Sequence, residues 1–175
     1  MELTPVLEKF ILHWGEMGSR WGINRTVAQI HALLYVSPTP LNAEQIASTL
    51  GVARSNVSTS LKELQGWGIV RNCHVLGDRR DHYQSMKDVW ALFQQVLDER
   101  KRREIDPTIA LLGQCVAEAD RPGAADDETR RRLRDLLEFL ETMTGWYTQI
   151  RQMPRNHLTR FVKLGGRVQK LLGWK

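Results

Sequence analysis

The sequence predicts a mostly α-helical protein with a small β-hairpin, and three observations support this fold class. Apolar residues recur every three or four positions over long stretches before residue 38 and after residue 86. Between these stretches, two short helical segments precede a run rich in β-branched residues, a glycine turn and a second short run. Prolines and glycines separate the segments, as they commonly do at helix ends and in turns.

Residues 1–40 are expected to form two helices that serve dimerisation or support the rest of the chain. The first begins at Thr4, whose hydroxyl can cap it, and at Pro5, which suits the first helical turn. This helix is then weakened by three glycines, Gly15, Gly18 and Gly22. A second apolar series covers residues 27–37 and is ended by Pro38.

Residues 41–85 begin with two short helices joined by a tight turn. In the first helix, over residues 43–50, Ile46 lies on the apolar face and Ala47 leaves room for a close neighbour. Gly51 then supplies a turn, because glycine adopts backbone angles that other residues avoid. The spacing is typical of a helix-turn-helix.

The second helix has an apolar inner face and a polar outer face. The inner face carries Val57, Leu61 and Leu64 at helical spacing. Six residues point mainly outward: Arg54, Ser55, Asn56, Ser58, Thr59 and Lys62. Asparagine can pair with adenine and arginine with guanine in a major groove, whereas Lys62, two turns in, is expected to meet phosphate. The outer face therefore predicts contact with double-stranded DNA.

A basic hairpin is expected to follow this helix. Residues 69–76 form its first strand, Gly77 and Asp78 its tip, and residues 81–85 its return strand. At the tip, Arg79 and Arg80 can reach an adjacent minor groove, with Asp78 and Asp81 orienting their guanidinium groups.

Each of these features has an ordinary structural reading, as helix packing or an exposed hairpin, but their combination within 45 residues predicts a winged helix-turn-helix DNA-binding domain over residues 41–85.

Residues 86–175 are expected to be long helices for dimerisation and effector response. The first covers about residues 86–118, where Pro107 marks a kink or a break, and the linker 121–125 follows. Asp126 or Asp127 can cap the next helix. Its apolar stripe contains Leu133, Leu136, Leu137, Leu140 and Met143 and continues to Trp146 and Ile150.

This stripe and the first helix of the chain have more apolar surface than a small winged domain needs. We therefore expect them to pair between the subunits of a homodimer, with an intrachain bundle as the alternative. Two-fold symmetry then predicts a pseudo-palindromic operator with half-sites about 10 bp apart.

The net charge of +5 arises at the end of the chain, because residues 151–175 hold seven basic and no acidic residues. A last helix there carries four of them, Arg160, Lys163, Arg167 and Lys170. We favour a solvated basic face on a dimer helix, and contact with flanking DNA phosphates or an anionic membrane are the alternatives.

Other functional classes find little support in the sequence. Cys73 and Cys115 have no metal-type or disulfide-type spacing, and Cys73 is either a core residue or a redox switch. A metal site at His74 and His82 lacks further ligands. We find no phosphate loop, nucleophile elbow or acid–base pair, so we expect a non-enzyme without cofactors. The absence of a signal-type N-terminus or a membrane span predicts a cytoplasmic protein.

Three segments resemble the MarR-like regulators and specifically their GbsR branch: RTVAQIHALLY (25–35), LGVARSNVSTSLKELQGWGIV (50–70) and LGDRRDHY (76–83). The resemblance implies a dimeric winged-helix repressor and, for the branch, sensing of choline or related osmolytes. By position, it implies a base-reading helix and a wing. Arg79 and Arg80 match the wing, and five residues match the base-reading helix: Arg54, Ser55, Asn56, Ser58 and Thr59. Ala53 departs from the pattern, because many relatives have a capping Ser or Thr there, so the helix start is open to a shift.

Tryptophans are the candidate residues for an effector site. Four tryptophans are candidates for an aromatic cage around a quaternary ammonium, Trp14, Trp21, Trp67 and Trp90, although we favour core packing as their role. Such a pocket is expected between the winged domain and the dimer helices.

We therefore expect a sequence-specific transcriptional regulator, a homodimeric repressor of its own or a neighbouring operon. A winged-helix adaptor for protein–protein contacts, without sequence-specific DNA binding, is the alternative.

Overall fold

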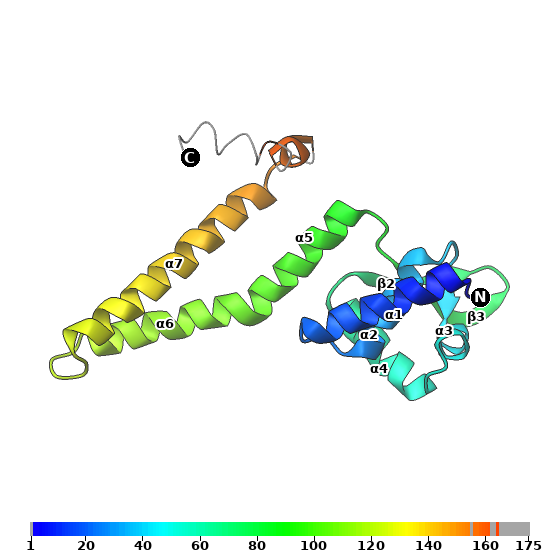
Figure 1. Cartoon of the computed structure of the whole chain (residues 1–175), viewed down its shortest axis with the longest axis horizontal. Helices are drawn as coiled ribbons and strands as arrows, with labels where there is room; N and C mark the ends of the chain where they lie inside the picture. Colours follow the sequence, from blue (N-terminus) through cyan, green and yellow to red (C-terminus); the bar gives the residue numbers. More distant parts are fainter. Residues whose placement is uncertain (1, 155, 162–163, 165–175) are drawn as a thin grey trace. The chain divides into compact units, whose positions relative to one another are not determined.

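The computed structural model describes residues 2–154, 156–161 and 164 (Figure 1). Its contacts divide the chain into two compact units, Met1–Leu97 and Asp98–Lys175, which we describe separately. The chain is mostly helical, with one three-stranded antiparallel sheet in the first unit. The predicted fold class is confirmed.

Helices α1 (Pro5–Arg20) and α2 (Arg25–Val36) open the first unit. Thr4 caps α1 by accepting a hydrogen bond from the backbone N–H of Leu7, as predicted. Gly15 and Gly18 lie inside this helix, where α2 packs closely, whereas Gly22 follows its end with φ of 76°. A Cβ atom on Gly18 would lie 2.5 Å from the Cβ of Ala28, so a larger residue would push the helices apart.

The helix-turn-helix consists of α3 (Ala43–Leu50) and α4 (Arg54–Gly66). Asn42 and Gln45 form a capping box at the start of α3, with reciprocal hydrogen bonds of 2.9 Å between each side chain and the other residue's backbone N–H. Gly51 ends α3 in the left-handed conformation, with φ of 65°. Apolar side chains from α2, α3 and α4 form the core, including Ile30, Leu33, Ile46, Val57, Leu61 and Leu64.

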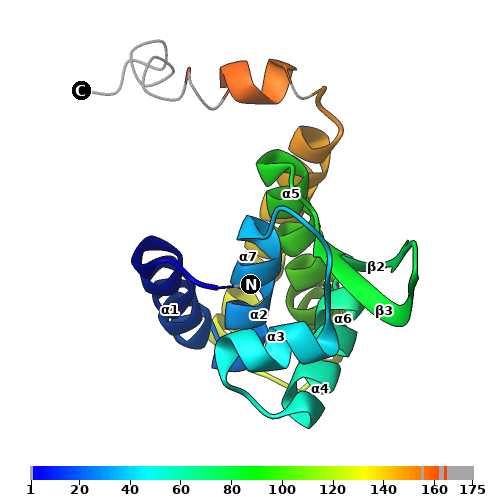
Figure 2. The same cartoon turned by 90° about the vertical axis from the view of Figure 1, so that its right-hand side faces the viewer.

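The sheet has the strand order β1 (Leu41–Asn42), β3 (Asp78–Ser85), β2 (Val70–Val75), with both pairs antiparallel. In the view of Figure 2, α2 lies between α1 and the β2–β3 hairpin. Val75 pairs with Asp78, so the turn consists of Leu76 and Gly77. The predicted tip was therefore shifted by one residue, and Arg79 and Arg80 lie on strand β3 because Asp78 already belongs to the ladder.

Three consecutive helical elements follow the hairpin. They are α5 (Val89–Arg100), the π-helical turn η1 (Lys101–Ile105) and α6 (Asp106–Ala119). Pro107 therefore does not break these helical elements. Proline lacks an N–H and clashes with the carbonyl four residues earlier, and the π turn before it changes the hydrogen-bond register at this point.

Helix α7 (Asp127–Arg151) follows the loop after α6. Asp126 caps this helix, because its carboxylate accepts a 2.7 Å hydrogen bond from the backbone N–H of Thr129. None of the residues of α7 is buried. Four of its large apolar side chains are exposed, Leu136, Phe139, Met143 and Trp146. None of the described helices combines the length and apolarity needed to cross a membrane.

Residues 156–161 are helical and include Arg160, whereas Lys163, Arg167 and Lys170 of the predicted basic helix lie outside the described residues.

Candidate functional site

The outer face of α4 carries the six polar residues singled out from the sequence. All six are exposed: Arg54, Ser55, Asn56, Ser58, Thr59 and Lys62. On the opposite face, Val57, Leu61 and Leu64 are at most 1% exposed and pack in the core. Because the inner face is fixed by packing, the outer side chains are presented from a rigid helix.

Helix α4 starts without a side-chain cap. Its N-cap residue is Ala53, with φ of −63° and ψ of 140°, and no side chain accepts from the first turn. The helix begins at Arg54, so the missing capping hydroxyl does not shift its start. The unpaired N–H groups of a helix N-terminus carry a partial positive charge.

A network of four charged side chains connects the hairpin with the helix-turn-helix. The guanidinium of Arg80 pairs with the carboxylate of Asp78, with Nε–Oδ1 and Nη2–Oδ2 distances of 2.9 and 2.6 Å. Nη1 of Arg80 lies 2.8 Å from Oε2 of Glu44 in the first turn of α3. The other oxygen of Glu44 lies 3.1 Å from Nη1 of Arg54. Glu44 therefore holds one arginine of the hairpin and one of α4.

The hydrogen bonds between Asp78 and Arg80 favour the charged forms of these two side chains. Hydrogen bonds from Arg80 hold the pKa of Asp78 well below its ordinary value. In return, Asp78 first and Glu44 second raise the pKa of the Arg80 guanidinium. All four side chains are accessible to solvent, so salt weakens these pairs and competing anions can replace them.

The network also distinguishes residues that the sequence treated alike. Asp78, rather than Asp81, pairs with Arg80. Arg79 is exposed and has no ion-pair partner within the described part of the chain. Sequence reasoning missed Glu44, because the residue lies 36 positions before Arg80 and only the fold brings them together.

The hairpin places Cys73 opposite His82, rather than His74 opposite His82, because an irregularity separates Cys73 from Val75. The Sγ atom of Cys73 lies 3.6 Å from the backbone oxygen of His82, and both cysteines are free thiols. Within residues 2–154, 156–161 and 164, no three His, Cys, Asp or Glu side chains gather as a metal site.

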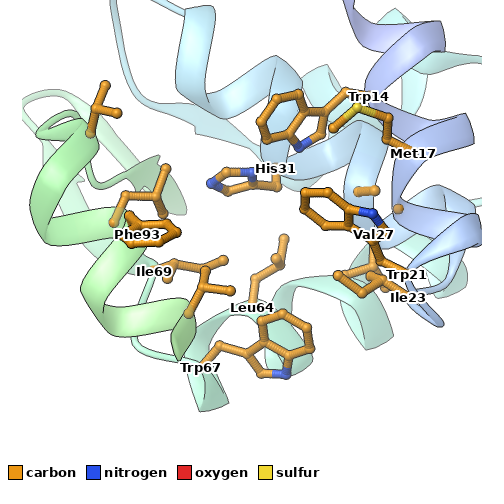
Figure 3. A pocket seen from close by; sticks show the side chains of 15 residues that line it. Trp14, Met17, Trp21, Ile23, Val27, His31, Leu64, Trp67, Ile69 and Phe93 are labelled. Atoms are coloured by element: carbon orange, nitrogen blue, oxygen red, sulfur yellow. The ribbon is translucent and has the colours of Figure 1, made fainter. Parts of the chain in front are cut away.

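A separate apolar cavity of about 240 Å³ lies within the first unit (Figure 3). Three of the four candidate tryptophans line it, Trp14, Trp21 and Trp67, together with Phe93 of α5. Trp90, which is half-buried on the same helix, is not among the lining residues. In Figure 3 the four aromatic rings surround the cavity, with Phe93 across from the indole of Trp21.

One histidine stands out among these apolar walls. His31 of α2 is 6% exposed, lies 6.3 Å from Trp14 between ring centroids, and has a buried Nε2 atom without a hydrogen-bond partner. Burial, and secondarily the ammonium group of Lys87, lowers the pKa of His31 to about 4. The imidazole is therefore neutral at pH 7.

Comparison with known proteins connects this geometry to a family. Residues 21–81, which cover α2 through the start of β3, match the sequence profile of the MarR family. Over this stretch, which contains the helix-turn-helix and most of the hairpin, the chain is similar to the MarR family.

The repressor GbsR of Bacillus subtilis (strain 168), described as HTH-type, is 18% identical to the chain over 139 residues, which are 78% of this chain and 77% of GbsR. A solved structure described as a transcriptional regulator aligns with a TM-score of 0.67 and 22% identity, over 91% of this chain and 99% of that one. This second likeness establishes the fold.

A winged-helix fold accounts for the observed arrangement of α3, α4 and the β2–β3 hairpin. The family consists of transcriptional regulators, which bind DNA and form dimers and are not enzymes. The predicted resemblance to MarR-like regulators is confirmed.

Proposed function

We propose that this chain is a sequence-specific, double-stranded DNA-binding transcriptional regulator that acts as a homodimeric repressor and responds to a small effector. The observation that carries the proposal is the exposed polar face of α4, held by three core residues on its opposite side. This arrangement suits a helix that lies in the major groove.

The residues of α4 divide by the contact that each can make. Asn56 can form two hydrogen bonds with adenine, and Arg54 with guanine, while the three hydroxyl residues reach base edges or phosphates at close range. Lys62 lies farther along the helix and meets the phosphate backbone. Arg79 and Arg80 approach the minor groove, where Arg79 is the less restrained of the two.

The proposal of a homodimer is supported by helix α7. Leu136 and Met143 are seven residues apart on one face, with Phe139 and Trp146 beside them, and each of the four is between 45 and 58% exposed. Because such a stripe is costly to leave in water, a second copy of the chain is its natural partner. A two-fold dimer presents two α4 helices to half-sites about 10 bp apart.

Repression and effector response rest on other observations. The curated relative GbsR is described as a repressor. The cavity in the first unit touches α1, α2, α5 and residues at the end of α4, so a bound compound would contact the helices that support the DNA-binding face.

The proposal is tested by titrating the protein into labelled DNA from upstream of its own gene and into scrambled duplex, at several salt concentrations, using fluorescence anisotropy. We expect preference for the upstream DNA, with an affinity that falls as salt rises. The Asn56→Ala variant should relax this preference, and Lys62→Gln should weaken binding to both duplexes alike.

Equal and weak binding to the upstream DNA, to scrambled duplex and to a randomised library would favour the adaptor function instead.

A further inference from the structure

The walls of the cavity in the first unit are almost entirely hydrocarbon. Its 15 lining residues come from α1, α2, the turn between these two helices, α5 and the segment around the end of α4, and they include no Asp, Glu, Lys or Arg. All of them belong to the described residues. A ligand with an apolar surface therefore loses little on entering, whereas an ion loses its water without gaining a counter-charge.

His31 is the one ionisable residue in this lining. Its Nε2 atom is buried and has no hydrogen-bond partner, although buried polar atoms in proteins are usually paired. In Figure 3 the imidazole extends from α2 toward the side of the cavity formed by Phe93. An unpaired polar atom among apolar walls favours a ligand with one polar group.

The charge around His31 argues against a cation. The ammonium of Lys87 acts on His31 electrostatically and lowers its pKa, so it repels positive charge there. Three backbone oxygens fix this ammonium, those of Leu34, Tyr35 and Ser37, at 2.6 to 2.8 Å. The aromatic rings can attract a cation through their faces, but this attraction alone must then offset both the repulsion and the lost hydration.

A hydroxyl group fits the unpaired atom in either state of the ring. Neutral histidine carries its proton on one of two nitrogens, so Nε2 is a donor in one tautomer and an acceptor in the other. A hydroxyl both donates and accepts hydrogen bonds, whereas a carbonyl only accepts them. The hydroxyl therefore satisfies Nε2 without requiring a particular tautomer.

We infer that the cavity binds a neutral, mainly hydrocarbon alcohol or phenol whose hydroxyl group hydrogen-bonds to Nε2 of His31. This names the effector class of the regulator, and its regulatory meaning rests on the proposed function. Nε2 is covered by protein atoms, so the ligand reaches it when lining side chains rearrange, and Phe93, 55% exposed, has room to do so. The inferred ligand differs from choline in charge, although choline also carries a hydroxyl.

The inference is tested on the full chain in the absence of DNA with two probes of the same shape. One is 4-tert-butylbenzyl alcohol, and the other is its cationic analogue, in which a trimethylammonium group replaces the tert-butyl group. Binding is followed through tryptophan fluorescence, because three indoles line the cavity. We expect a saturable change with the alcohol and at least tenfold weaker binding of the cation.

The role of His31 is tested with His31→Leu, which keeps an apolar side chain of similar size but removes the nitrogen. We expect about tenfold weaker binding of the alcohol, while His13→Leu, which changes an exposed histidine of α1, should bind it like the wild type. The probe comparison needs no variant, so it tests the preference for a neutral ligand even if His31→Leu folds poorly.

Tighter binding of the cation, or no saturable change with either probe, would overturn the inference. Since no DNA is present, failure of this test leaves the DNA-binding proposal intact, and the DNA titration can fail while this test succeeds.

Discussion

The carboxylate of Glu44 lies 2.8 Å from the guanidinium of Arg80 and connects the first turn of α3 with the β2–β3 hairpin. The same carboxylate lies 3.1 Å from Arg54 at the start of α4. Two arginines that are expected to meet DNA therefore share one acidic partner. A phosphate or base that binds either arginine must compete with Glu44, which also fixes their positions before DNA arrives.

Replacing Glu44 by glutamine should make DNA binding tighter but less selective. The variant removes a negative charge from the surface that faces phosphate and releases both arginines from a fixed position. We expect roughly two- to tenfold tighter binding to scrambled duplex and a smaller gain for the operator. Anisotropy titrations of both duplexes at the same salt concentration measure the ratio of operator affinity to scrambled-duplex affinity.

The matched control is Asp81→Asn, which removes the same charge from strand β3 without breaking the pairs of Glu44. If both variants change the ratio equally, charge alone explains the effect and Glu44 does not position the arginines.

The contrast between Glu44 and the residues of α4 shows what could be predicted from sequence. The outer face of α4 and the cap at Thr4 follow from local spacing, and the structure has them where they were expected. The ion pair from Glu44 joins residues 36 positions apart and depends on how α3 packs beside the hairpin. Similarly, the one-residue shift of the turn to Leu76 and Gly77 depends on strand register, because glycine and aspartate both suit such turns.

The lining of the cavity could be predicted only in part, because it also depends on how distant segments pack. Four tryptophans were candidates, and nothing in their spacing distinguishes Trp90, whose position on α5 leaves it outside the lining. His31 fits a helical apolar series and gives no sign of its unpaired nitrogen.

Restoring a cap at the start of α4 should stabilise the protein. Ala53 has the extended backbone of an N-cap residue but no side-chain oxygen to accept from the first turn. We expect Ala53→Thr to raise the free energy of unfolding by about 1 kcal/mol. Chemical denaturation measures the change, and Ala53→Val, which has the same shape without a hydroxyl, should give no such gain. Equal stability of the two variants would show that the helix start is already satisfied in another way.

Stability should fall in mild acid because of His31. Burial, with Lys87 as the smaller cause, lowers the pKa of this residue from 6.5 to about 4 in the folded protein. The unfolded chain therefore binds a proton at His31 more readily than the folded protein does. The part of the free energy of unfolding that depends on a neutral His31 is complete above pH 6.5 and is lost as the pH falls toward 4. The total loss is at most about 3 kcal/mol.

Unfolding experiments between pH 7 and 4.5 measure this dependence. His31→Phe should remove most of the slope in this range, since the carboxylates with lowered pKa values, such as Asp78, titrate at lower pH. The exposed His13, replaced in the same way, should leave the slope unchanged. A wild-type slope that persists in His31→Phe would contradict the burial of a neutral imidazole.

Charges on the exposed stripe of α7 should separate the subunits. The double variant Phe139→Lys and Met143→Lys places two ammonium groups on an apolar surface that a second copy is proposed to cover. We expect a monomer by analytical ultracentrifugation and at least tenfold weaker operator binding, because one subunit reaches only one half-site. Glu141→Lys, on the opposite face of the helix, should remain dimeric. A double variant that sediments like the wild type would place the dimer interface elsewhere.

The most direct test of the central claim is selection of binding sites from a random duplex library by the wild type, Asn56→Ala and Lys62→Gln. If α4 reads bases, the wild type should enrich a two-fold symmetric sequence with half-sites about one helical turn apart. Asn56→Ala should lose the preference at one position in each half-site, and Lys62→Gln should select the same sequence with lower affinity. A library that stays random after selection by the wild type would contradict the claim that this winged helix recognises a DNA sequence.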